Sequence, residues 1–383
     1  MMGKKAVLSL FLAVIVAASV SYSNNVSQNI SVSLDSIRAL YSKPVSEWPA
    51  PHIDSGVVWE EFKALNRTTM DGARMASEPQ VILGKLLFFD PILSGSNQIS
   101  CSTCHNPQTS WADHLTVSVG SDHKEGVRNT ISLLNVYARK KLFWDGRATS
   151  LEEQALGPIE AHHEMNMDLT KLVPKLKAIP AYRELFKDVY GDENFSMPEI
   201  LEALAAFQRT LYSRRTRFDD FLEGKYSALN DQEIYGLHLF RTKARCMNCH
   251  YGEFFTDELF HNIGLTYYKR GKYEDWGLYE VTKNPEDIGK FRTPMLRDVM
   301  NTGPWMHNGL FGDMTGLLNM YNSGMQMNNP TAEEKAADPL HPVVDPLMKP
   351  LNLTKGEIAA VEAFLHSITG AKYRMSRPEK LPR

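Results

Sequence analysis

Apolar residues recur at helical spacing along most of the chain, and this pattern predicts a mostly α-helical protein. Runs with apolar positions three or four residues apart cover 81–90, 169–190, 197–221 and 353–368. Few segments alternate between apolar and polar residues with the period of two that is typical of a strand. We therefore expect helices to form the core and strands to be minor elements.

Helix-capping residues support several of these helices. Ser150 stands before an expected helix over 151–161 and has Glu153 three residues after it, and Thr354 precedes Glu357 in the same way. The side-chain oxygen of such a Ser or Thr accepts a hydrogen bond from a free amide of the first turn. Each helix is therefore predicted to begin directly after its capping residue.

Three more helix starts are predicted by other local features. Ser100 is placed to cap a short helix that begins at Cys101. Pro198 follows Met197 at a position where a helix commonly starts. A further helix is expected over 231–243.

Polar and glycine-rich stretches interrupt the helical pattern. Residues 106–130 and 268–290 are expected to be loops. Gly224 and Asn230 mark a joint between two parts of the chain, and the polar tail from Met375 is expected to be loosely held.

The first residues resemble a targeting signal rather than folded structure. Lys4 and Lys5 are followed by an uncharged apolar run over 6–20 and then by polar residues. This layout predicts a cleavable secretory signal over 1–23, with an uncleaved membrane anchor as the alternative. The mature chain of about 360 residues would then be periplasmic, and no later apolar stretch is long enough for a transmembrane span.

Composition excludes one class of partner and draws attention to one segment. The net charge of -3 argues against nucleic acid as a partner. Seven of the 17 methionines lie between Met295 and Met327. Methionine commonly fills irregular core space, and in a haem protein its thioether can also be an axial ligand.

All four cysteines stand in two copies of one motif, Cys-x-x-Cys-His. The residues are Cys101, Cys104 and His105 in the first copy, and Cys246, Cys249 and His250 in the second. This motif attaches c-type haem, since its thiols add to the porphyrin vinyl groups and its His becomes the proximal iron ligand. A redox dithiol or a zinc site is the alternative for a single Cys-x-x-Cys. Two complete motifs with no other cysteine predict two covalent c-type haems.

The spacing of the motifs predicts the domain organisation. They stand 145 residues apart, counted from Cys101 to Cys246. We expect two cytochrome c-like α-domains with one haem each, over 24–224 and 225–383.

Several further motifs resemble those of the bacterial di-haem cytochrome c peroxidases and their relative MauG. They are Arg128-Asn129, Leu133-Leu-Asn135, Trp144-Asp-Gly-Arg147, Phe291-Arg-Thr-Pro-Met-Leu-Arg297 and Thr302-Gly-Pro-Trp-Met-His-Asn-Gly309. With the two haem motifs, the resemblance covers most of the chain from about residue 82 to about residue 370. It implies two cytochrome c-like domains with a calcium ion between them.

The resemblance also implies a site for peroxide at the first haem. His105 would hold the iron of this haem, and Gln154 and Glu164 match the family's distal pair above it. Breaking the O–O bond requires a proton to move between the peroxide oxygens, which a carboxylate can carry and an amide can help to orient. Glu164 is the candidate general acid/base; a solvated surface glutamate is the alternative.

Two other family positions fall between the haems. Trp144 matches the tryptophan that lies between them and would carry electrons, which is compatible with a place in the core. Asn129, with the backbone carbonyls of Thr302 and Pro304, matches the family's calcium ligands, and such hard oxygen donors suit Ca²⁺.

The chain departs from the conventional peroxidases at the distal position of the first haem. Where these enzymes have a ligating His after a Gly, this chain has Ser121 after Gly120. A hydroxyl is a poor ligand of ferric haem, so we predict an open distal position that needs no reductive activation, as in MauG. His123 and His114 are nearby candidates that would replace the missing ligand if the loop bends differently.

The sixth ligand of the second haem, whose proximal ligand is His250, is a further point of difference. The family uses Met in conventional enzymes and Tyr in MauG, and the Tyr-Asn-x-Gly sequence here aligns Tyr321 with the MauG tyrosine. The rivals are Met320, Met325 and Met327. A thioether raises the haem potential, whereas a phenolate lowers it. His261 and His307 are expected to be structural, hydrogen-bonded residues.

Together these features predict a cytochrome-c peroxidase that reduces hydrogen peroxide with electrons from a cytochrome c or a cupredoxin. A MauG-like enzyme that oxidises side chains of a partner protein is the first alternative. A non-catalytic di-haem electron carrier or redox sensor is the second. Homodimers are common in the family, although no residue pattern here indicates one.

Overall fold

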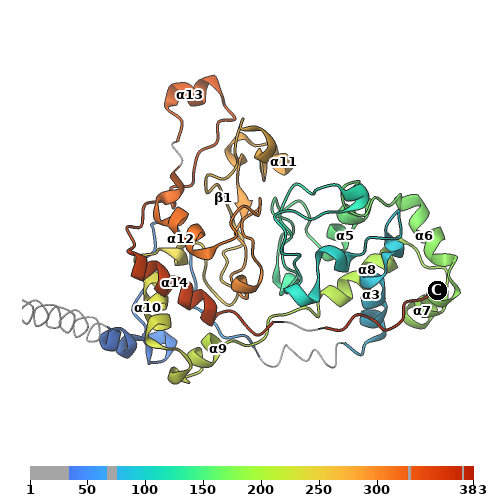
Figure 1. Cartoon of the computed structure of the whole chain (residues 1–383), viewed down its shortest axis with the longest axis horizontal. Helices are drawn as coiled ribbons and strands as arrows, with labels where there is room; N and C mark the ends of the chain where they lie inside the picture. Colours follow the sequence, from blue (N-terminus) through green and yellow to red (C-terminus); the bar gives the residue numbers. More distant parts are fainter. Residues whose placement is uncertain (1–33, 67–75, 327–328, 373–374) are drawn as a thin grey trace, which may run out of the picture.

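The computed structural model describes residues 34–66, 76–326, 329–372 and 375–383, which form two mainly helical lobes (Figure 1). The expected signal over 1–23 lies outside the described residues. The helices of the first lobe are α3 (Pro79–Phe89), α4 (Cys101–Cys104), α5 (Leu151–Glu160), α6 (Leu169–Lys177), α7 (Pro180–Tyr190) and α8 (Met197–Gln208). Those of the second lobe are α9 (Arg217–Leu222), α10 (Asp231–Arg241), α11 (Tyr279–Thr282), α12 (Met314–Asn322), α13 (Ala332–Ala337) and α14 (Lys355–Ser367).

Sheet structure is minor, as the sequence predicts. Within the described residues the sheet consists of β1 (Phe260–His261) paired antiparallel with β2 (Phe291–Arg292). None of the helices in this part of the chain is both long and apolar enough to cross a membrane.

Each lobe has its own apolar core, built around one closely packed pair of helices. In the first lobe, α3 packs on α8 at Gly84, where a Cβ would collide with the carbonyl group of Ala203. In the second lobe, α10 packs on α14 at Gly236, where a Cβ would collide with the carbonyl group of Ala360. The same contact is thus repeated in both lobes, since each glycine lets two backbones approach closely.

The three predicted caps, Ser100, Ser150 and Thr354, are present, and Ser196 adds a fourth that the sequence analysis did not name. Capping boxes begin α4 at Ser100, α8 at Ser196 and α14 at Thr354. At α5 the Ser150 side chain accepts from the amide of Glu153 at 3.1 Å, but the Glu153 carboxylate accepts from the amide of Thr149. The helix therefore begins where expected, although the Glu153 carboxylate accepts from Thr149 and not from the amide of Ser150, as a full capping box would require.

Two long apolar runs are each divided into two helices. The run over 169–190 breaks at Ile179, because a residue that precedes a proline is disfavoured in the helical region. The run over 197–221 breaks after α8, where Ser213 exchanges hydrogen bonds of 2.7 and 2.8 Å with the side chain of Asn135. These contacts with a distant loop replace the helical hydrogen bonds that the spacing predicts.

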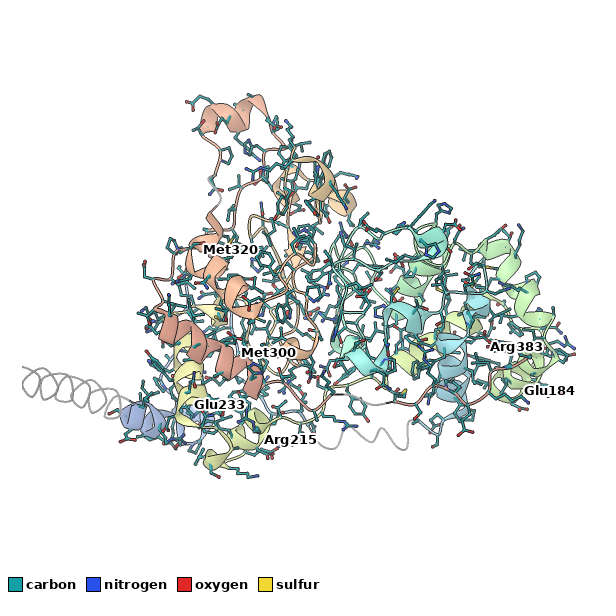
Figure 2. All side chains as sticks on the ribbon, viewed as in Figure 1. Glu184, Arg215, Glu233, Met300, Met320 and Arg383 are labelled. Atoms are coloured by element: carbon teal, nitrogen blue, oxygen red, sulfur yellow. The ribbon has the colours of Figure 1, made fainter. Side chains whose placement is uncertain are left out.

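The C-terminal tail is held against the first lobe, contrary to the expectation that it is loose. Arg383 donates to the buried carboxylate of Asp90 at 2.8 Å. Met375 and Leu381 pack on the apolar core of that lobe. Figure 2 shows Arg383 close to Glu184 of α7, far along the molecule from α14.

Candidate active site

The first Cys-x-x-Cys-His motif forms α4 and its C-terminal cap. Ser100 and Thr103 close the capping box that starts this single turn, and His105 ends it. The His105 Nδ1 atom lies 3.0 Å from the carbonyl oxygen of Trp111, a fully buried residue. With Nδ1 bonded in this way, Nε2 is the nitrogen left to bind a metal.

The second motif repeats this arrangement on a different turn. Cys246 begins a short 3₁₀ turn, and the His250 Nδ1 atom lies 2.8 Å from the carbonyl oxygen of Phe255. Trp111 and Phe255 both have positive φ angles, 63° and 56°, and both are fully buried. The sequence analysis missed these two positioning residues, because their role is carried by a main-chain carbonyl and leaves no side-chain signature.

The four thiols are free, and each cysteine is half-buried. Burial raises the pKa of Cys101 and of Cys246 to about 12, and that of Cys104 to about 11. Burial also raises the pKa of Cys249. Each thiol pair therefore stands beside a histidine with a free Nε2, which is the donor set that a covalent haem requires.

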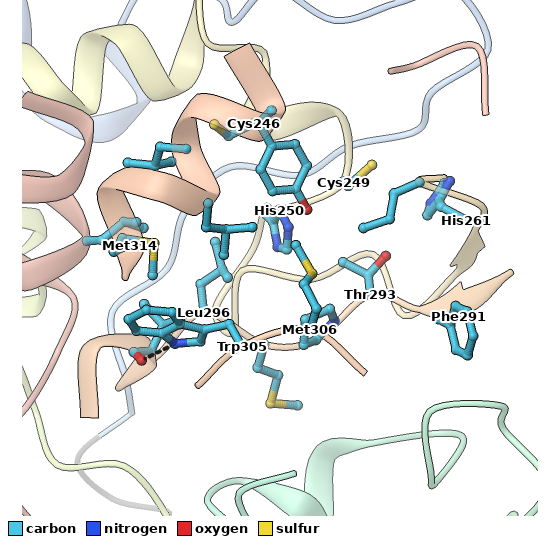
Figure 3. Close-up of a pocket in the computed structure, with 18 of the residues that line it drawn as sticks. Cys246, Cys249, His250, His261, Phe291, Thr293, Leu296, Trp305, Met306 and Met314 are labelled. Carbon is cyan, nitrogen blue, oxygen red and sulfur yellow. Dashed lines mark hydrogen bonds between the residues drawn. The ribbon is translucent and has the colours of Figure 1, made fainter. Parts of the chain in front are cut away.

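A largely apolar cavity surrounds the second motif (Figure 3). Its wall includes His250 with both cysteines of the motif, and side chains from β2 and α12. The apolar lining residues include Phe240, Leu296, Val299, Trp305, Leu317, Leu318, Val361 and Leu365. Such a wall fits the face of a porphyrin, so the residues present suit a haem here.

Glu164 and Ser121 lie together near the first motif. The amide of Ser121 donates to the carbonyl oxygen of Glu164 at 2.8 Å. The negative charge of Glu164 contributes to the raised pKa of the Cys101 and Cys104 thiols, which places the carboxylate near the haem motif. The Ser121 hydroxyl is buried and has no hydrogen-bond partner among the described residues.

The environment of Glu164 raises the pKa of its carboxyl group. Burial raises this pKa, opposed by the positive charges of His163 and Arg147. His163 Nε2 lies 3.6 Å from Glu164 Oε1. A carboxyl group with a raised pKa beside a haem motif is suited to accept and return a proton.

The other residues predicted around this site are more dispersed. Gln154 is half-buried on α5, and no hydrogen bond joins its side chain to Glu164 in the described structure. His123 is exposed, and His114 Nε2 lies 2.9 Å from the carbonyl oxygen of Asn301. The structure therefore brings Ser121, rather than either histidine, next to Glu164.

Trp144 lies between the lobes, on the wall of the second cavity. Its side chain is 8 % exposed, and its Nε1 donates to the carbonyl oxygen of Asn129 at 2.9 Å. Its own carbonyl accepts from the amide of Arg292 in β2 at 2.9 Å. These bonds fix both the indole and its backbone.

The three residues predicted to hold calcium, Asn129, Thr302 and Pro304, all line this cavity. The Asn129 Nδ2 donates to the carbonyl oxygen of Leu115 at 2.9 Å, which directs the amide oxygen Oδ1 away from that contact. The donor set is all oxygen, so it fits a calcium ion.

Tyr321 is the predicted sixth ligand that reaches the cavity of the second motif. Burial raises its pKa, and the charges of Cys249 and Cys246 raise it further. Among the described residues, Met320 and Met325 are absent from the cavity wall, with Met320 on α12 (Figure 2). Met327 lies outside the described residues.

Met306 is a rival that the ligand prediction missed. It lines the cavity with His250 and Met314 (Figure 3), and Met295 and Met348 line the same cavity. The methionine-rich stretch was the only signal in the sequence, and it does not distinguish core methionines from cavity methionines.

The two histidines expected to be structural behave differently. His261 is hydrogen-bonded on both sides, to Asp345 at 2.6 Å and to Asp257 at 2.9 Å. His307 stacks on Phe291 with ring centroids 3.5 Å apart, and its Nε2 is buried without a hydrogen-bond partner within the described residues. Burial lowers the pKa of His307 to about 4.

The fold and these sites define a mostly helical, haem-binding oxidoreductase. A family model described as di-haem cytochrome c peroxidase matches residues 78–227. The methylamine utilization protein MauG of Methylorubrum extorquens is 38% identical over 301 residues, which is 78% of this chain and 81% of that protein. The chain therefore belongs to the di-haem cytochrome c peroxidase and MauG family, whose members are peroxidase-type enzymes with haem cofactors.

Other comparisons agree with this assignment. A cytochrome-c peroxidase of Denitromonas iodatirespirans is 35% identical over 331 residues, covering 79% of this chain and 85% of that protein. A solved MauG-like protein associated with microbial copper homeostasis superposes with a TM-score of 0.67 at 29% identity, over 84% of this chain and 93% of that one.

Proposed function

We propose that this protein is a periplasmic di-haem peroxidase that carries two covalent c-type haems, one in each of the two lobes. It reduces hydrogen peroxide to water, and each peroxide consumes two protons and two electrons. A small redox protein, either a cytochrome c or a cupredoxin, supplies the electrons one at a time. The haems supply the iron that binds peroxide and stores the oxidising equivalents.

The observation that carries the proposal is the contact between Ser121 and Glu164. A serine at the position of the distal histidine leaves peroxide a free approach on the side opposite His105. The main-chain carbonyl of Glu164 accepts from the amide of Ser121, and the charge of its carboxylate acts on both thiols of the haem motif. A carboxyl group there takes the proton from one peroxide oxygen and delivers it to the other.

Gln154 assists Glu164 from α5. Its amide hydrogens would orient the peroxide so that a proton can move from one peroxide oxygen to the other. Gln154 is half-buried on α5, and among the described residues no hydrogen bond joins its side chain to Glu164.

His250 and Tyr321 would hold the second haem, which would supply the entry point for electrons. The phenolate oxygen of Tyr321 lowers the potential of this haem and favours retention of an oxidising equivalent. Trp144 then connects the two haems, and its bond to Asn129 holds the indole in place. Asn129 and the carbonyls of Thr302 and Pro304 would hold a calcium ion, which would fix the segments on which this connection depends.

A second function is favoured by Tyr321 and by the similarity to MauG. In this candidate the same oxidising equivalents are used to modify side chains of a partner protein. Steady-state turnover with reduced cytochrome c and with a reduced cupredoxin distinguishes the two functions. Sustained peroxide-dependent oxidation of either donor supports the peroxidase; single turnovers that stall with both donors would contradict it.

A further inference from the structure

The arginines that line the cavity of the second motif are not all neutralised to the same extent. Arg297 is fully buried and forms a bidentate pair with Asp219, at 2.9 and 3.1 Å. Arg245 is paired with Asp54, near the solvent. Arg297 therefore has a carboxylate to itself, whereas Arg245 shares Asp54 with Lys349 at a partly exposed site, so neither arginine leaves a charge buried without a partner.

Arg139 and Arg292 instead share a single carboxylate. The Nη1 atoms of Arg139 and Arg292 lie 3.3 and 3.2 Å from the same oxygen of Glu258, Oε1. The side chains of the two arginines are 4 % and 1 % exposed. The cluster therefore carries one uncompensated positive charge away from water, which is costly unless an anion joins it.

Hydrogen bonding within this cluster is also incomplete. Arg139 Nε is buried and has no partner among the described residues. Arg292 Nε donates to the carbonyl oxygen of Phe143 at 3.3 Å. Burial and the charge of Arg292 lower the pKa of Arg139 to about 9, so it stays protonated at neutral pH but is poorly stabilised. Burial lowers the pKa of Arg292 in the same way.

The surplus charge faces the cavity. Arg139 and Arg292 are both part of its wall, whereas no aspartate or glutamate of the described chain lines it. Figure 3 shows Phe291 and Thr293, which flank Arg292 in the chain, below and to the right of Cys246. The thiols attach to the vinyl groups of a porphyrin, and its two carboxylates extend from the opposite edge.

We propose that Arg139 and Arg292 form a carboxylate-binding site for a propionate group of the haem held by His250. This inference rests on the proposed function in one respect only, that a haem occupies the cavity. The two planar guanidinium groups offer more N–H donors than Glu258 can accept, and such groups pair well with carboxylates. Because Arg292 also binds the backbone of Phe143 and Trp144, the site connects the second haem to the tryptophan between the lobes.

Charge substitutions in the haem-loaded protein test the site in both directions. Arg139→Gln removes the positive charge, which is expected to lower the midpoint potential of the second haem, because a nearby cation favours the reduced iron. Glu258→Gln removes the negative charge and is expected to raise that potential. Arg209→Gln is the matched control, since Arg209 is an exposed arginine paired with Glu152 on α5.

Resonance Raman spectra supply a readout that a purely structural role would not change. Arg139→Gln is expected to shift the propionate bending band of the second haem, and Arg209→Gln is expected to leave it in place. Unchanged bands and unchanged potentials in Arg139→Gln and Glu258→Gln would overturn the proposal. If Arg139→Gln loses haem, Arg139→Lys tests the proposal instead. Lysine keeps the positive charge but lacks the planar guanidinium group, so the propionate bending band should still shift.

The outcome is separable from that of the proposed function. The reaction of the wild-type protein with stoichiometric peroxide is recorded in the same preparations. If the wild-type protein is inert to peroxide while Arg139→Gln and Glu258→Gln shift the potential in opposite directions, the propionate site is supported and the peroxidase function is contradicted.

Discussion

The main-chain amide of Ser121 donates a hydrogen bond to the carbonyl oxygen of Glu164 at 2.8 Å. This bond holds the loop that has Ser121 in place of the family's distal histidine against the segment that carries Glu164. Gly120 makes this approach possible, since a Cβ there would collide with the carbonyl oxygens of His163 and Glu164. The distance between the two chain segments is therefore set by backbone contacts.

Restoring a histidine at this position is expected to close the distal site. Ser121→His places an imidazole where conventional family members have a ligand, so the first haem should change from high-spin to low-spin in the ferric state. Its reaction with peroxide should slow accordingly. Electron paramagnetic resonance of the oxidised protein measures the spin state, with Ser121→Ala as the control that should stay high-spin. A high-spin Ser121→His protein would show that this loop does not face the iron.

Replacing the proton carrier is expected to slow the peroxide reaction without affecting haem attachment. Glu164→Gln should lower the rate constant roughly 100- to 10,000-fold, the usual contribution of a positioned acid/base. Glu160→Gln, on the exposed end of α5, is the control and should react like the wild type. Stopped-flow absorption of the ferric protein measures both. Equal rates for the two variants would exclude Glu164 from the reaction.

The same group predicts the pH dependence of that rate. Only the ionised carboxylate can accept the proton, so the rate should fall as the pH is lowered through the pKa of Glu164. Burial raises this pKa, and the decline should therefore lie at higher pH than for an ordinary glutamate. A pH series with the wild type and Glu164→Gln tests this, because the variant should lack the decline. An identical decline in both proteins would assign it to another group.

Changing the sixth ligand is expected to change the potential of the second haem. Tyr321→Met should raise its midpoint potential, since a thioether replaces a phenolate. Tyr273→Phe, which alters an exposed tyrosine, is the control. Spectroelectrochemical titration measures the potentials. If Tyr321→Met and Tyr321→Phe both keep the wild-type potential, Met306 becomes the better candidate, because it shares the cavity.

Trp144→Phe should impair both stability and electron transfer between the haems. The substitution leaves the Asn129 carbonyl without its indole donor, which costs about 1–3 kcal/mol in a buried site. The first step with peroxide should persist, whereas reduction of the first haem through the second should slow. Thermal unfolding and rapid-mixing reduction measure the two effects. Normal electron transfer in the variant would remove Trp144 from the proposed path.

The sequence predicts local features of this fold well and long-range features poorly. Ser100 and Thr354 cap their helices because a cap depends on residues within one turn. The helix break after α8 depends on a hydrogen bond to Asn135, and the position of the C-terminal tail depends on the contact of Arg383 with Asp90. Both partners are distant in the sequence from the segments they fix. No local pattern contains such contacts.

The candidate site divides in the same way. Both haem motifs can be identified from the sequence, because covalent haem attachment requires two cysteines and a histidine at fixed spacing. The carbonyl groups of Trp111 and Phe255 and the arginine cluster around Glu258 are not, because they depend on how separate loops meet. Glu164 as the acid/base and Tyr321 as the sixth ligand were predicted from the family resemblance, and the composition of the chain indicates neither role.

The central claim is that the first haem reacts with peroxide in the fully oxidised protein, without prior reduction. One measurement tests it most directly: the Soret absorption of the ferric protein after addition of one equivalent of hydrogen peroxide. The account predicts a rapid change of the band that reduced donor protein reverses. A band that stays unchanged in the ferric protein, and changes only after one haem has been reduced, would contradict an open distal site beside Glu164.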